Sequence, residues 1–65
     1  MSSRKMALTA LISALDDASD RAEEALSLYS GPENGITISV LGMIRDYLVS
    51  SASTVQGLHA SEESE

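Results

Sequence analysis

The fold is decided by residues 8 to 29, which read LTALISALDDASDRAEEALSLY. Apolar residues recur through this stretch at alternating intervals of three and four, and the polar residues avoid those positions. These seven apolar residues, here called the first stripe, are Leu8, Leu11, Leu15, Ala18, Ala22, Ala25 and Tyr29. A repeat of this period keeps one narrow side of an α-helix against a partner helix. The stretch therefore predicts a helix over about residues 5–30 that packs against another helix.

A break follows at residues 31–35, GPENG. Glycine supplies positive φ angles, proline cannot continue a helix, and an Asn-Gly pair is a strong turn signal. A second helix is expected over about residues 36–59, and so short a connection makes the two helices antiparallel neighbours. Residues 36–40, ITISV, alternate in polarity and also fit a short strand. A lone strand would have no partner in this chain, which favours the helix.

The second helix carries its own apolar repeat: Leu41, Ile44, Leu48, Ser51 or Ala52, Val55 and Leu58. Folding the chain about Glu33 sets large residues of one helix against small residues of the other, as interdigitated packing requires. The expected fold is all-α, an antiparallel two-helix hairpin over residues 1–60. The acidic residues 61–65 are expected to form a disordered tail.

More apolar residues are present than one hairpin can cover. A second stripe on the second helix comprises Ile36, Val40, Met43 and Tyr47. Three apolar residues of the first helix lie beside the first stripe: Ile12, Leu26 and Leu28. A helix that is apolar around most of its girth is buried on more than one side, and a 65-residue domain is marginal alone. These seven residues are expected to form a dimer or partner interface, and two hairpins would make a four-helix bundle.

Charge and composition exclude several classes of function. The net charge is −6, with only four basic residues, so direct binding to nucleic acid or to an anionic membrane is not expected. The chain has no cysteine, which suits the cytoplasm. Residues 2–15 resemble the start of a signal peptide only faintly, since Asp16 and Asp17 follow without a cleavage site. No apolar run approaches the ~18 residues of a membrane span.

One cluster of carboxylates is dense enough to suggest a site: Asp16, Asp17, Asp20, Glu23 and Glu24. These residues avoid the first stripe and are expected to form a solvated acidic surface, with Asp17 and Arg21 as an i, i+4 ion pair. His59 stands alone near the end of the second helix, where the helix dipole favours its charged form. No nucleophile has a base nearby. We expect neither catalysis nor a bound metal or cofactor.

In plan, the expected hairpin dimer resembles small bacterial helical hairpins that control plasmid copy number and the helical-hairpin co-chaperones of secretion systems. The resemblance is one of architecture and implies a bacterial or phage regulator or adaptor that binds another protein stoichiometrically. Two other functions fit the sequence. The chain could be an acidic mimic of nucleic acid that occupies a basic groove, or a structural module that only assembles with itself.

Overall fold

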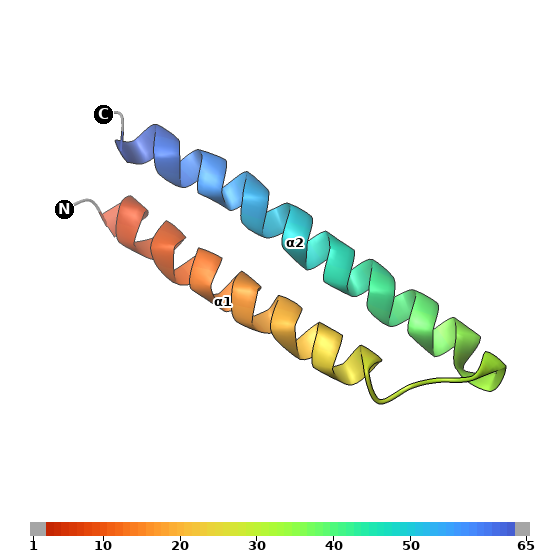
Figure 1. Cartoon of the computed structure of the whole chain (residues 1–65). Helices are drawn as coiled ribbons and strands as arrows, with labels where there is room; N and C mark the ends of the chain where they lie inside the picture. Colours follow the sequence, from red (N-terminus) through yellow and green to blue (C-terminus); the bar gives the residue numbers. More distant parts are fainter. Residues whose placement is uncertain (1–2, 64–65) are drawn as a thin grey trace.

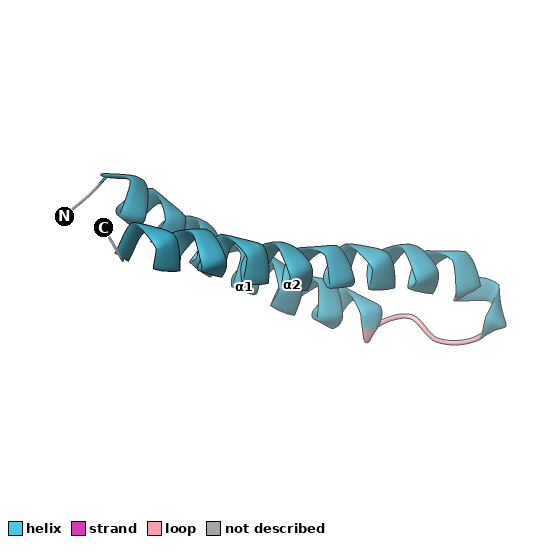
Figure 2. Cartoon of the chain, turned by 90° about the horizontal axis from the view of Figure 1, so that it is seen from above, coloured by secondary structure: helices cyan, strands magenta, loops and turns pink. Residues whose placement is uncertain are grey.

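The computed structural model describes residues 3–63, and these form two long helices joined by a short loop (Figure 1). Helix α1 spans Ser3–Leu26, a 3₁₀ turn η1 spans Pro32–Asn34, and helix α2 spans Gly35–Glu63. The helices run antiparallel as a single layer, an elongated hairpin of 51 × 14 × 11 Å (Figures 1 and 2). Within the described range there is no strand, and residues 36–40 are helical. The all-α hairpin is confirmed.

Helix α1 ends four residues earlier than the periodicity predicts. The amides of Leu28 and Tyr29 donate to the carbonyls three residues before them, at 3.1 Å each, so the last turn tightens and then stops. The Ser27 hydroxyl also donates to the Glu24 carbonyl at 2.6 Å. Tyr29, the last member of the first stripe, therefore lies in the loop and is exposed.

The loop is shaped by Gly31 and held by Asn34. Gly31 has a positive φ of 92°, which residues with a Cβ atom rarely adopt. The Asn34 side-chain amide donates to the Ser30 carbonyl at 2.7 Å, and its backbone amide donates to the Gly31 carbonyl at 3.1 Å. These bonds fold the chain back so that α2 begins at Gly35.

Helix α2 continues past the end that the sequence predicts. Ser61 and Glu62, expected in a disordered tail, are helical, while residues 64 and 65 lie outside the described part of the chain. The Glu62 carboxylate forms an ion pair with Arg4 across the open end of the hairpin, at 3.8 Å. This contact ties the last turn of α2 to the first turn of α1.

The seam between the helices departs from the first stripe at every second member, where it uses the next residue along the chain. Its half-buried members in α1 repeat at intervals of three and four: Lys5, Leu8, Ile12, Leu15, Ser19, Ala22 and Leu26. Leu8, Leu15 and Ala22 were predicted there, whereas Leu11 is exposed and Ile12 takes its place. Ala18 and Ala25 are half-buried at the border of the seam.

Helix α2 supplies an equally regular set of seam residues: Ile38, Leu41, Arg45, Leu48, Ala52, Val55, His59 and Glu62. Ile44 and Leu58, predicted to face α1, are instead exposed. Among residues whose burial the structure describes, only Ala52 is buried, at 5% exposure. The hairpin thus has a seam one side chain thick and no enclosed core.

Candidate interaction surfaces

Two helices in one layer leave two broad faces, and the contacts between α1 and α2 distinguish them. On one face, Thr9 Oγ1 lies 2.9 Å from His59 Nε2, and a Glu23 carboxylate oxygen lies 3.9 Å from an Arg45 guanidinium nitrogen. Thr9 and Glu23 are two heptads apart in α1, as are Arg45 and His59 in α2. Residues two heptads apart share one side of a packed helix. We call this side the polar face.

Thr9 and His59 are joined by a hydrogen bond between their side chains. The Thr9 hydroxyl also donates to the Lys5 carbonyl at 3.0 Å. His59, interpreted from the sequence as a helix-terminal residue, is half-buried within the seam and joins the two helices.

Arg45 serves a similar role nearer the loop. Its Nε and Nη2 atoms donate to the Asp46 carboxylate at 3.3 and 3.1 Å, and Nη1 faces Glu23. Its side chain is half-buried, because the aliphatic part covers the seam while the guanidinium reaches solvent. The sequence analysis missed both cross-helix contacts; the equal spacing of Thr9–Glu23 and Arg45–His59 was the available signal.

The five carboxylates of the acidic surface are all exposed: Asp16, Asp17, Asp20, Glu23 and Glu24. Asp17 pairs with Arg21 at 3.8 Å, the i, i+4 pair that the spacing predicts. Among residues 3–63, no three His, Cys, Asp or Glu side chains are grouped so that they could hold a metal ion. These acids lie on the outer side of α1 and on the polar face.

The residues predicted as an interface separate into two groups. Ile36, Met43 and Tyr47 of the second stripe are 84%, 70% and 73% exposed, and Val40 and Leu28 are also exposed. Helical spacing places Ile36 and Met43 on the side of α2 opposite the seam. Ile12 and Leu26 are half-buried in the seam and so do not belong to the same surface.

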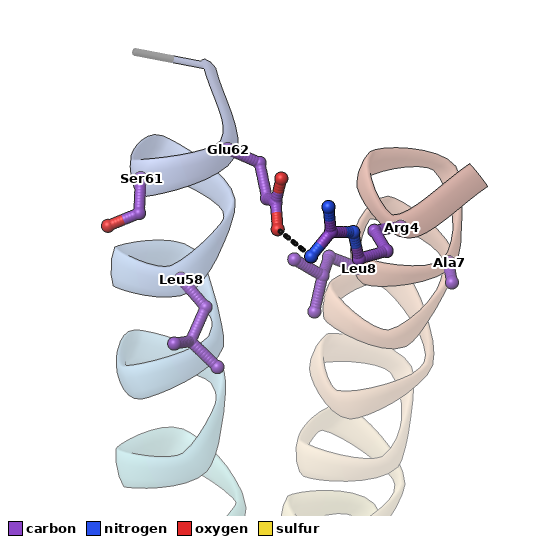
Figure 3. Close-up of a pocket in the computed structure, with 6 residues that line it drawn as sticks. All are labelled: Arg4, Ala7, Leu8, Leu58, Ser61 and Glu62. Carbon is purple, nitrogen blue, oxygen red and sulfur yellow. Dashed lines mark ion pairs between the residues drawn. The ribbon is translucent and has the colours of Figure 1, made fainter. Parts of the chain in front are cut away.

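The other broad face, here called the groove face, is open and apolar. Near the chain ends a groove between the helices is lined by Arg4, Ala7, Leu8, Leu58, Ser61 and Glu62 (Figure 3). Leu8 and Leu58 point toward one another there, and the Arg4–Glu62 ion pair spans it. Leu11 lies one heptad from Arg4 and Ile44 two heptads from Leu58, so both continue this face, and they are 44% and 47% exposed.

Comparison with protein-family models, curated proteins and solved structures gives no match for this chain. Over the described residues, neither helix is long and apolar enough to cross a membrane.

Proposed function

We propose that this chain is a non-enzymatic protein–protein interaction module, a cytoplasmic bacterial or phage regulator or adaptor that binds another protein stoichiometrically. The observation that carries the proposal is the exposed second stripe on α2, where Ile36, Met43 and Tyr47 present most of their surface to solvent. Contiguous apolar residues rimmed by polar ones mark sites of protein contact. The seam does not account for Ile36 and Met43, because they lie on its far side.

The mode of binding follows from the shape of this surface. Residues at intervals of four, three and four along one helix fit an amphipathic helix or apolar groove of a partner. The acidic residues of α1 would favour a partner with basic residues beside its apolar ones. Binding would act by occupying the partner's surface, with no covalent chemistry.

The test compares the wild-type chain with the double variant I36E/M43E as tagged bait in cytosol of the source organism. The variant places two carboxylates in the proposed contact, where desolvation would penalise them. A partner retained at one-to-one stoichiometry by the wild type and lost by I36E/M43E supports the proposal. The control is S39E/S53E, which adds the same charge at exposed serines on the polar-face side of α2. Equal capture by all three would contradict it.

The exposed carboxylates of α1 favour a second candidate, an acidic mimic of nucleic acid that occupies a basic groove. Salt separates the two functions, because charge pairing weakens steeply with ionic strength and apolar packing does not. A mimic would be released between about 0.1 and 0.5 M salt, and D17N/D20N/E24Q would lose the partner. The third candidate, a self-assembling structural module, predicts that no heterologous protein binds.

A further inference from the structure

We propose that the groove face is a self-association surface on which a second copy of this chain packs, with α2 of each copy lying on α1 of the other. This surface shares Val40 and Tyr47 with the second stripe predicted as the interface, but it excludes Ile36 and Met43. It comprises Ala7, Leu11, Ala14, Ala18 and Ala25 of α1, and Val40, Ile44, Tyr47, Ser51 and Leu58 of α2.

Helical spacing and the observed contacts assign these residues to one side. The two sets follow the same intervals of four, three, four and seven, which keep residues together on a packed helix. The groove lined by Ala7 and Leu58 fixes which side that is (Figure 3). The Thr9–His59 and Glu23–Arg45 contacts fix the polar face as its opposite.

The exposed area of the hairpin is large enough to supply one side of a dimer interface. The accessible surface is 4775 Å². A compact globular monomer of this mass would expose about 4,000 Å². The excess of roughly 800 Å² equals what each partner buries in a standard protein interface. One further layer of two helices would cover the groove face and supply the enclosed core that the hairpin lacks.

The shapes of the two halves of the groove face are complementary under a two-fold rotation. Its α1 half is mostly alanine, whereas its α2 half carries Val40, Ile44, Tyr47 and Leu58. A two-fold axis along the length of the hairpin sets α2 of one copy over α1 of the other. The alanine-rich half of each copy then meets the bulkier half of the other, as in a packed helical bundle.

The charges favour this face over the polar one. The ionised residues on or beside the groove face are paired, Arg4 with Glu62 and Arg21 with Asp17. Two copies joined there would keep the acidic residues of α1 turned outward. Joining the polar faces would instead bring Asp16 and Glu23 of both copies together, at a cost in like-charge repulsion.

Sedimentation equilibrium tests the interface with a matched pair of substitutions. L11E places a charge in the proposed contact of both copies, whereas M6E changes an apolar residue that is 58% exposed and lines a depression with Thr9 on the polar face. We expect a wild-type dimer whose dissociation constant rises about 100-fold or more in L11E and less than about threefold in M6E. Wild-type protein that stays monomeric at millimolar concentration, or equal effects of the two variants, would overturn the proposal.

Thiol cross-linking tests the orientation even if L11E unfolds, because the chain has no cysteine of its own. Mixed A14C and T54C chains carry thiols at the same height on the groove face, and mixed S13C and S53C chains carry them on the polar face. A short bis-maleimide should join A14C to T54C between chains and leave the S13C and S53C mixture unlinked. Preferential linkage of the second mixture would refute the assignment.

Discussion

Helices α1 and α2 supply similar repeats to the seam but differ in what they turn away from it. The outer side of α1, which points away from α2, carries Asp17, Asp20 and Glu24. The apolar residues of α1 therefore lie mostly in the seam or at its borders. The outer side of α2 carries Ile36 and Met43 over its first half. An amphipathic helix needs only one covered side, whereas a helix that is apolar on two sides needs two. Helix α2 is therefore the element whose composition the hairpin leaves unexplained.

The largest expected effect is a difference in the free energy of unfolding between substitutions on the two sides of α2. Leu48 is half-buried in the seam, and L48A should lower the free energy of unfolding by about 2 kcal/mol or more. M43A, on the outer side of α2, should change it by less than about 0.5 kcal/mol. Urea unfolding followed by circular dichroism at one protein concentration measures both. Similar losses in the two variants would mean that the outer side is already covered in the folded protein.

The next effect concerns the loop that joins the helices. Gly31 has a positive φ, and a Cβ atom there would lie 2.7 Å from the Glu33 carboxylate oxygens. G31A should therefore destabilise the hairpin by about 1–2 kcal/mol through backbone strain. Adding E33A to G31A removes the clash but not the strain, so it should recover only part of the loss. Full recovery would show that the Gly31 conformation is not required.

Helix α2 also contains glycines that the hairpin does not need. A Cβ atom at Gly42 or Gly57 would meet nothing within 4 Å, and both residues have helical backbones. G42A and G57A should each stabilise the fold by about 0.4–1 kcal/mol by restricting the unfolded chain. Thermal unfolding should show a higher midpoint for each. A loss of stability in G57A, which lies on the outer side of α2, would indicate close approach of another chain there.

The sequence predicts the hairpin because its signals agree at every level. The 3–4 repeat, the GPENG break and the good helix formers all indicate two antiparallel helices. The predicted pairing about Glu33 is also close to the observed contacts. The midpoint in sequence between the two contacting residues is 34 for Thr9–His59 and Glu23–Arg45. It is 33 for Arg4–Glu62.

The side of α1 that faces α2 could not be read from apolar spacing, because Leu11–Ile12 and Ala25–Leu26 are adjacent apolar pairs. After Leu8, the next seam residue can be either Leu11 or Ile12, and both choices continue an apolar repeat. The observed choice brings Thr9 and Glu23 beside the seam, within reach of His59 and Arg45. These polar contacts across the helices distinguish the observed phase from the alternative, which apolar spacing leaves nearly equal. For the same reason, Ile12 and Leu26, predicted as dimer or partner interface residues, are half-buried in the seam between α1 and α2.

The smallest expected effect tests whether the Glu23–Arg45 contact contributes to the free energy of unfolding. E23Q removes one charge of the Glu23–Arg45 pair, whose side chains are 66% and 35% exposed and 3.9 Å apart. Partly exposed pairs contribute little, and Arg45 retains Asp46, so the loss should be below about 0.5 kcal/mol. E24Q makes the same change in net charge on the outer side of α1 and serves as the control. The difference between E23Q and E24Q should shrink further as salt is raised from 0.05 to about 0.5 M. A difference above about 1 kcal/mol that persists in high salt would mean that this contact holds the two helices in register, and that the apolar seam alone does not.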